Sequence, residues 1–327
     1  LAKGTVVKMP NKIKFGYLVP TRDAVMRAPD GRADIRRMLD LAVRSEQMGY
    51  DSLWIGDSLL ARPRFEALTT LAAISALTKK IELGTAVYIT PLRHPVPLAH
   101  TVGNLDLLSG GRFIFGIGLG PESPPVKAEY AASGADFHKR GKLQEEAIQI
   151  MKALWTGQKT TFQGANYQIE NVTLHPLPGR QGGPPILMAA AADRALRRLA
   201  QYADGWLPIV PTAEEYAKDW ARIEHHCAEF GRDPKSLQSV HYLTLNVNPN
   251  EAEAAHEMEE FLLAYYGQLH HIIKKTQAIC AGTPERVAEF IRGFVKAGAP
   301  HFVVRLATPN QEPQMERFLS SVVPLLL

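Results

Sequence analysis

Short runs of almost continuously hydrophobic residues, many of them β-branched, recur along the chain between longer segments of mixed character. Because strands that are covered on both faces have such continuous runs, the pattern predicts buried parallel strands. The predicted strands are 13–19, 52–57, 81–89, 112–118, 185–190, 205–210, 241–247 and 301–307.

The mixed segments have helical periodicity. In residues 35–48 the apolar side chains fall on one face, and Gly49 follows as a C-cap. The same periodicity predicts helices over 65–77, 97–108, 143–155, 195–202, 216–230 and 285–297. Eight strands that alternate with helices are typical of a closed (β/α)8 barrel, or TIM barrel, which carries its chemistry at the carboxyl ends of the strands. A doubly wound open sheet is the alternative.

Two segments are longer than ordinary loops. Residues 157–184, after the fourth strand, are polar and rich in turn residues and predict a small hairpin. Residues 248–282, after the seventh strand, begin with an acidic helix start and become aromatic and rich in histidine. We therefore predict one domain over 1–327 with two insertions and a flexible lead-in at 1–12. The second insertion is predicted to be a lid, with an additional packing helix as the alternative.

The composition is that of an ordinary globular protein, with 46% hydrophobic and 21% charged residues. The formal net charge of +4, from 37 basic and 33 acidic residues, is too small and too scattered to predict nucleic-acid binding. Cys227 and Cys280 lack metal or redox spacing, so we expect reduced thiols and a cytoplasmic protein. No apolar run approaches the roughly 18 to 20 residues of a membrane helix, and we expect no membrane partner.

A glycine series at 116–120 follows the fourth predicted strand. A dinucleotide fingerprint must open a helix, whereas prolines follow here at 121, 124 and 125, so we expect no helix. The glycines instead predict bare backbone at a strand end, Gly118 included, against which a flat group lies closely.

An anion site is predicted where the fifth strand ends. Alanines at 189–192 lead into a helix that carries Arg194. Small side chains let backbone N–H groups approach a phosphate at the positive end of a helix, and Arg194 supplies a charge-assisted contact. The alternative is tight packing of the alanines, with Asp193 as an N-cap.

Eight short motifs occur in one order along residues 13–307. They are Phe15-Gly16-Tyr17, Gly49-Tyr50-Asp51-Ser52-Leu53-Trp54, Leu83-Gly84-Thr85-Ala86-Val87, Arg93-His94-Pro95, the stretch from Leu105 to Arg112, the glycine series, Leu154-Trp155-Thr156-Gly157 and Ala203-Asp204-Gly205-Trp206. Together they resemble the bacterial luciferase-like superfamily, whose members use a flavin or the deazaflavin coenzyme F420.

The resemblance implies a (β/α)8 barrel that holds the cofactor ring at its carboxyl mouth. It also implies a non-prolyl cis peptide at the end of the third strand, at Ala86–Val87, and a cofactor phosphate beside Ala191 and Ala192. The cofactor-binding residues that we assign on this basis are Tyr17, Asp57, Ala86, Val87, Gly118, Ala190, Ala191, Ala192 and Arg194.

The candidates for proton transfer are Ser58, Glu122 and His138. Many F420-dependent relatives have Asp-His where this chain has Asp57-Ser58, and a serine does not titrate near neutrality. Glu122 is a partial substitute or a solvated loop carboxylate. His138 is the preferred acid or base, with a surface or capping role as the alternative. Arg305, inside the eighth strand, holds a substrate or cofactor anion, or forms a structural ion pair.

The resemblance therefore implies a monooxygenase that uses reduced FMN and O₂ on a small organic substrate. No NAD(P)H site is evident, so a separate flavin reductase is expected as a partner. The first alternative is hydride transfer with F420, and the second is a catalytically idle flavin-binding protein. No spacing predicts a bound metal, and homodimers are common in the family.

Overall fold

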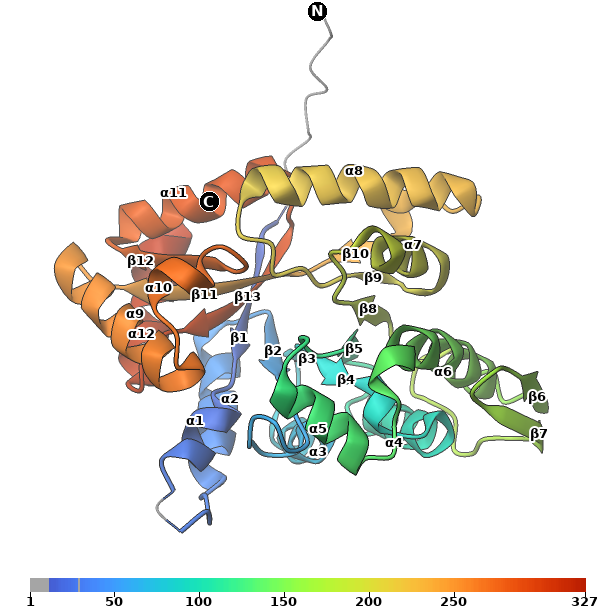
Figure 1. Ribbon diagram of the computed structural model, residues 1–327. Helices are drawn as coiled ribbons and strands as arrows, with labels where there is room; N and C mark the ends of the chain where they lie inside the picture. The colour runs from blue at the N-terminus through green and yellow to red at the C-terminus, as the bar shows by residue number, and fades with distance from the viewer. Residues whose placement is uncertain (1–11, 29) are drawn as a thin grey trace, which may run out of the picture.

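The hydrophobic runs form a parallel sheet that curls around a central axis (Figure 1). The computed structural model describes residues 12–28 and 30–327, so the predicted lead-in lies outside the described residues except for Lys12. The strands of the sheet are β1 (Lys14–Leu18), β2 (Ser52–Ile55), β3 (Glu82–Thr85), β4 (Tyr88–Ile89), β5 (Phe113–Gly118), β8 (Ile186–Met188), β9 (Gly205–Trp206), β10 (Gln238–Ser239), β11 (His241–Val247), β12 (Ala278–Gly282) and β13 (His301–Leu306).

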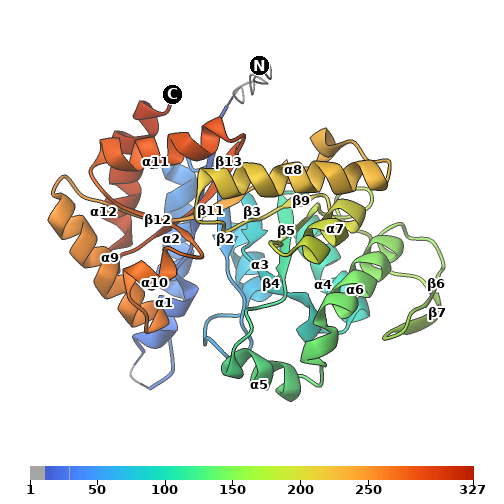
Figure 2. The ribbon, with the colours of Figure 1, turned by 45° about the horizontal axis from the view of Figure 1, so that its top comes forward.

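Helices surround this sheet, most of them on its outer side (Figures 1 and 2). They are α1 (Thr21–Met26), α2 (Arg36–Met48), α3 (Ala67–Leu77), α4 (Pro95–Leu108), α5 (Pro124–Ala132), α6 (Arg140–Leu154), α7 (Asp193–Tyr202), α8 (Ala213–Glu229), α9 (Glu251–Tyr266), α10 (His270–Ile273), α11 (Pro284–Lys296) and α12 (Gln311–Arg317). A separate antiparallel hairpin, β6 (Thr160–Gln163) and β7 (Gln168–Val172), lies at the edge of the molecule beside α6.

The two sides of the sheet meet through one short stretch of chain. In space the strands follow the order β10-β9-β8-β5-β3-β2-β1-β13-β11-β12. Only Val240 separates β10 from β11, although these strands stand at opposite sides of that order. The Val240 N–H donates to the Trp206 carbonyl at 2.9 Å, and the Tyr242 N–H donates to the Pro208 carbonyl at 2.9 Å. The sheet therefore curls far enough for its first strand, β10, to continue directly into β11, which stands next to the last strand, β12.

Side chains from all around the curl form one inner cluster. Its buried members are Leu18, Trp54, Ile114, Leu187, Leu207, Val240, Tyr242 and Val303. Trp54 is completely buried there, and it fits because Gly16 and Gly84 have no side chains. A Cβ atom at Gly84 would lie 2.3 Å from the indole ring, and one at Gly16 would lie 2.5 Å from the indole nitrogen. The interior is thus a packed core below the rim of the sheet.

Each predicted strand and helix overlaps an observed element, and the hairpin predicted within 157–184 is present, whereas α1, α12 and β12 have no predicted counterpart. The prediction that no helix follows the glycine series is wrong, because α5 begins at Pro124. Proline is compatible with the first turn of a helix, since the N–H that it lacks has no partner in the helix.

Within 12–28 and 30–327, no helix combines the length and the apolar character that a membrane crossing requires.

Candidate active site

The carboxyl ends of β2, β3 and β5 meet around a cis peptide bond. The bond joins Ala86 to Val87, as the resemblance predicts. The Ala86 N–H donates to the Ile55 carbonyl at 2.8 Å, and the Val87 carbonyl accepts from the Asp57 N–H at 3.2 Å. Backbone bonds to the end of β2 therefore fix both residues of the cis pair at the rim of the sheet.

The glycine series lets β5 approach this bond. A Cβ atom at Gly116 would lie 1.9 Å from the Thr85 carbonyl oxygen, and one at Gly118 would lie 2.4 Å from the Val87 Cγ2 atom. The Thr85 hydroxyl also donates to the Gly116 carbonyl at 2.7 Å. The close neighbours of this bare backbone are therefore β3 and Val87, and its contact with a flat ligand stays a prediction.

Asp57 has an internal role beneath the rim. Its carboxylate accepts two hydrogen bonds from Arg93, at 2.6 and 2.9 Å, and one from the Ile89 N–H at 3.0 Å. Burial raises the pKa of Asp57, and Arg93 opposes this effect. The Arg93 guanidinium also lies 4.2 Å from the centre of the Tyr88 ring. The carboxylate predicted to contact the cofactor therefore fixes the chain that follows the cis bond.

Ser58 lies in a buried network with Glu129 of α5. The Ser58 hydroxyl donates to Glu129 Oε1 at 3.0 Å and accepts from the Arg62 N–H at 2.9 Å. The Leu60 N–H donates to the same carboxylate oxygen at 2.7 Å. Glu129 is completely buried, and its Oε2 atom has no hydrogen-bond partner among the described residues. A titratable group thus stands beside Ser58, although nothing in the sequence marks Glu129.

The other two proton-transfer candidates are exposed. His138 lies just before α6, and its backbone N–H donates to Asp136 Oδ1 at 2.9 Å. Glu122 forms an ion pair with Lys127 at 2.8 Å, and this hydrogen bond lowers the pKa of Glu122. The structure therefore does not bring either side chain into the buried network of Ser58.

Tyr17 faces the outer layer instead of the mouth. It is completely buried, its hydroxyl donates to Gln311 Oε1 of α12 at 2.8 Å, and its ring centre lies 5.8 Å from that of Tyr50. Because side chains alternate along a strand, the neighbouring Leu18 is the one that belongs to the inner cluster. A cofactor at the mouth would therefore meet the end of β1 beyond Tyr17.

The start of α7 is open toward solvent at the predicted anion site. Ala191, Ala192 and Arg194 are exposed, and Ala192 caps the helix without a side-chain hydrogen bond. Asp193 does not cap this helix, because its carboxylate pairs with Arg222 at 2.9 Å. Ala190 lies deeper, and its carbonyl accepts from the Trp206 indole at 2.9 Å. The first N–H groups of α7 are therefore left for an external acceptor.

Arg198 lies on α7 one turn after Arg194 and adds positive charge to the predicted anion site. Its Nε atom is buried without a hydrogen-bond partner among the described residues. Its guanidinium lies against Gly141 in the first turn of α6, where a Cβ atom would come within 2.9 Å of Nη1. Arg140 has a buried Nε atom without a described partner as well. These orphaned donors fit the phosphate that flavin and deazaflavin cofactors share.

Arg305 of β13 lies 4% exposed on the opposite side of the mouth. It donates to the Thr244 hydroxyl at 2.7 and 3.1 Å and to the Tyr266 hydroxyl at 2.6 Å. Within the described ranges it forms no ion pair, so the structural ion pair considered as an alternative is absent there.

The sequence of this chain matches a known protein family. The family model described as luciferase-like monooxygenase matches residues 13–301. The chain belongs to the luciferase-like monooxygenase family.

Curated relatives of this luciferase-like chain match it over most of its length. It is similar to the F420-dependent glucose-6-phosphate dehydrogenase of Kineococcus radiotolerans, with 26% identity over 321 residues that cover 89% of this chain and 93% of the relative. The protein of the same name from Amycolatopsis mediterranei is 28% identical over 323 residues, covering 89% and 94%. Both relatives are named as dehydrogenases, which are enzymes of oxidation and reduction.

Solved structures of luciferase-like enzymes have the same fold. An F420-dependent secondary alcohol dehydrogenase, in complex with an F420-acetone adduct, superposes with a TM-score of 0.80 at 20% identity and covers 97% of this chain and 99% of its own. A monooxygenase from Streptomyces bottropensis has a TM-score of 0.78 at 19% identity, covering 95% and 99%. At these identities the likeness concerns the curled α/β fold alone.

Proposed function

We propose that the chain is an F420-dependent oxidoreductase that transfers hydride to or from a small organic substrate. The observation that supports this most directly is the match, along nearly the whole of both chains, to dehydrogenases named for F420. The sequence favours reduced FMN as the main cofactor and F420 as the alternative, and these relatives reverse that order. In this proposal the curled sheet is a (β/α)8 barrel with insertions at 157–184 and 248–282.

The rim residues fit such a cofactor in two places. The Ala86–Val87 bond and Gly118 offer a surface without bulky polar groups, and the open start of α7 with Arg194 and Arg198 offers donors for an anionic tail. F420, when bound, supplies a carbon atom that accepts or releases a hydride. The protein's part is to hold the tail, support one face and keep water away.

Ser58 and Glu129 are the residues that we propose for proton handling. Ser58 occupies the position after Asp57 at which many F420-dependent relatives have histidine, and the Glu129 carboxyl group hydrogen-bonds to it at 3.0 Å. A buried carboxyl with one oxygen lacking a partner can hold or release a proton without a large rearrangement. His138 remains a candidate only for a cofactor or substrate that extends to the surface.

An anaerobic titration tests the function. We expect oxidised F420 to bind the purified chain with a change in its fluorescence, and its visible absorbance to fall when a substrate from a panel of alcohols and phosphorylated sugars is added. The Arg198→Met variant should bind F420 more weakly, whereas Arg44→Gln, on the far helix α2, should bind it like the parent chain. A chain that binds no F420 under these conditions would contradict the proposal.

An FMN-dependent monooxygenase is the second candidate, because structures of monooxygenases share the fold with TM-scores of 0.78 and 0.76. It requires a separate reductase to supply reduced FMN. Addition of reduced FMN and O₂ to the same substrate panel, with product detected by mass spectrometry, distinguishes the two. Oxygen incorporation without any F420 reduction would favour this candidate.

A further inference from the structure

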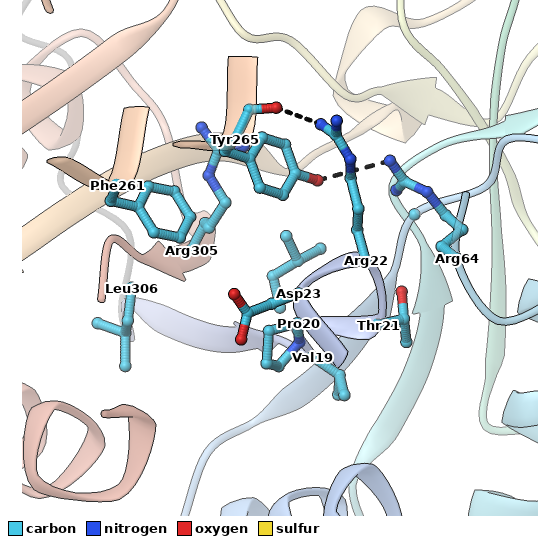
Figure 3. A pocket seen from close by; sticks show the side chains of 12 residues that line it. Val19, Pro20, Thr21, Arg22, Asp23, Arg64, Phe261, Tyr265, Arg305 and Leu306 are labelled. Carbon is cyan, nitrogen blue, oxygen red and sulfur yellow. Dashed lines mark hydrogen bonds between the residues drawn. The ribbon is translucent and has the colours of Figure 1, made fainter. Parts of the chain in front are cut away.

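Arg22, Arg64 and Arg305 line a small cavity where β1, β2 and β13 end, beside helix α9 (Figure 3). Arg62 lies close by, against the Tyr266 ring. Arg22 belongs to α1, Arg62 and Arg64 follow β2, and Arg305 belongs to β13. The cavity among them has about 20 Å³ of free volume, which is room for a single water molecule. It is small because Tyr265 of α9 projects into the cluster.

The arginines have no carboxylate partner within residues 12–28 and 30–327. The groups that accept from Arg22 and Arg64 are backbone carbonyls and a hydroxyl. Asp23 lines the cavity, but its carboxylate pairs with Arg27 at 2.9 Å. Burial lowers the pKa of Arg22, and the positive charges of Arg62 and Arg64 lower it further. The cluster therefore carries an uncompensated positive charge.

Arg305 shows this imbalance most clearly. Its side chain is almost entirely buried, yet its partners are the neutral oxygen atoms of Thr244, Tyr266 and Gln277. A buried charge normally needs an opposite charge as well as hydrogen bonds, because neutral acceptors replace only part of its hydration. The buried guanidinium thus lacks a counter-ion that the described residues do not supply.

Tyr265 occupies the place where such a counter-ion would lie. Its backbone carbonyl accepts from Arg22, and its hydroxyl accepts from Arg64 at 3.5 Å. The centre of its ring lies 4.4 Å from Arg22 Cζ and 5.0 Å from Arg305 Cζ (Figure 3). Burial raises the pKa of this hydroxyl, but the surrounding arginines outweigh burial and leave the pKa below its ordinary value. The surroundings therefore stabilise a negatively charged oxygen at this point.

The Tyr265 side chain can also be displaced from the cluster. It is only partly buried, it lies in the last turn of α9, and Gly267 ends that helix in the left-handed conformation. Its bond to Arg64 is long, so little is lost when a stronger acceptor replaces it. Phe261 and Tyr266, on the same helix, would continue to cover the cluster.

We propose that Arg22, Arg64 and Arg305 bind an oxyanion, the carboxylate or phosphate group of a small substrate, in place of the Tyr265 hydroxyl. Guanidinium groups suit this role because they bind such oxyanions with pairs of hydrogen bonds. That the oxyanion belongs to the substrate of hydride transfer rests on the proposed function. The binding of the oxyanion itself does not depend on it.

Calorimetric titration of the full chain with inorganic phosphate and with acetate tests the site. We expect saturable binding of at least one of them. Arg64→Gln should weaken that binding by about tenfold or more, since a bond to a charged group is lost. The control Arg44→Gln removes an exposed arginine that pairs with Glu316 at 2.9 Å, and it should bind like the parent. Circular dichroism and thermal unfolding verify that each variant is folded.

Each outcome decides the proposal. Binding of phosphate alone that Arg64→Gln weakens assigns a phosphate monoester as the substrate class, and such binding of acetate alone assigns a carboxylic acid. Binding of neither anion, or equal binding by folded Arg64→Gln and the parent chain, overturns it. Arg305→Gln is a second variant of the site. If this buried replacement unfolds the chain, the result with Arg64→Gln decides.

Failure of the site is distinguishable from failure of the proposed function. If phosphate or acetate binding requires Arg64 but F420 neither binds nor is reduced, the oxyanion site stands and the function is wrong. If F420 is reduced by a substrate whose KM is the same in Arg64→Gln, the function stands and the site is wrong.

Discussion

Stability in mild acid should depend on His241, a buried histidine of β11. It is completely buried, with its ring centre 4.4 Å from that of Phe294 and 5.5 Å from that of Tyr216. Neither ring nitrogen has a hydrogen-bond partner among the described residues. Burial lowers the pKa of His241 from 6.5 to about 3. The folded chain therefore holds this side chain neutral at a pH at which an exposed histidine is charged.

The sign of the effect follows from proton binding. Between pH 6.5 and pH 3 the unfolded chain takes up a proton at His241 that the folded chain does not, so the free energy of unfolding falls as the pH falls. At pH 5 the pKa difference corresponds to about 2 kcal/mol of lost stability, and at pH 7.5 to almost none.

The His241→Phe variant removes the titration and keeps an aromatic ring in the same surroundings. We expect urea unfolding at pH 7.5 to give similar free energies for the variant and the parent chain. At pH 5 the variant should be more stable than the parent by about 2 kcal/mol. His100→Gln, at an exposed histidine of α4, is the matched control and should follow the parent at both values of pH.

Equal losses of stability between pH 7.5 and pH 5 in the parent and in His241→Phe would refute the reasoning. Such a result would mean that the folded chain accommodates a charged His241, through movement or hydration of its surroundings. A lower stability of the variant at pH 7.5 would not by itself refute the reasoning, because a packing defect lowers the stability equally at both values of pH.

Three further predictions concern the mouth of the sheet. Gly118→Ala places a methyl group against Val87 and should lower the stability by about 1–3 kcal/mol in thermal unfolding; an unchanged melting temperature would contradict the packing described at this bond. Glu129→Gln preserves the hydrogen bond from Ser58 but not the titratable group, so kcat of F420 reduction should fall by about a hundredfold with F420 affinity unchanged, and an unaffected kcat would exclude the carboxyl from proton transfer. His138→Ala alters an exposed side chain and should leave kcat unchanged in the same assay, whereas a large loss would return the acid or base role to His138.

The fold is predictable from the sequence because its signals are local. Each strand is a short continuous apolar run, and each helix repeats its apolar positions on one face, so neither depends on distant contacts. Helix α5 is one exception, since the prolines at its start are typical of loops although they suit a first turn. The short helices α1 and α12 and strand β12 are also not predicted. The short β9 and the separation of β10 from β11 by one residue depend on how the sheet curls, which no local pattern expresses.

The site is predictable only where a motif determines backbone geometry. The bare backbone of Gly118 follows from the sequence itself, and the cis bond follows from the resemblance to the luciferase-like family. The partners of side chains, by contrast, do not follow from short motifs. The pairing of Asp57 with Arg93 joins two distant segments through the fold, and Glu129 lies on α5, which the pattern does not predict. The arginines around Tyr265 come from several distant segments, so no spacing marks them.

Strand β12 has a consequence for how the region that carries Tyr265 can be exchanged. It pairs with β11 from Leu243 and Ala278 to Val247 and Gly282, and the Asn248 N–H donates to the Gly282 carbonyl at 3.0 Å. Because the two strands are parallel, the segment between them, with α9 and α10, leaves the sheet at the carboxyl end of β11 and returns at the amino end of β12, opposite Leu243. It is a crossover connection between neighbouring parallel strands, so a different cover that spans the length of β12 can be grafted between Val247 and Ala278 while the other strands keep their register.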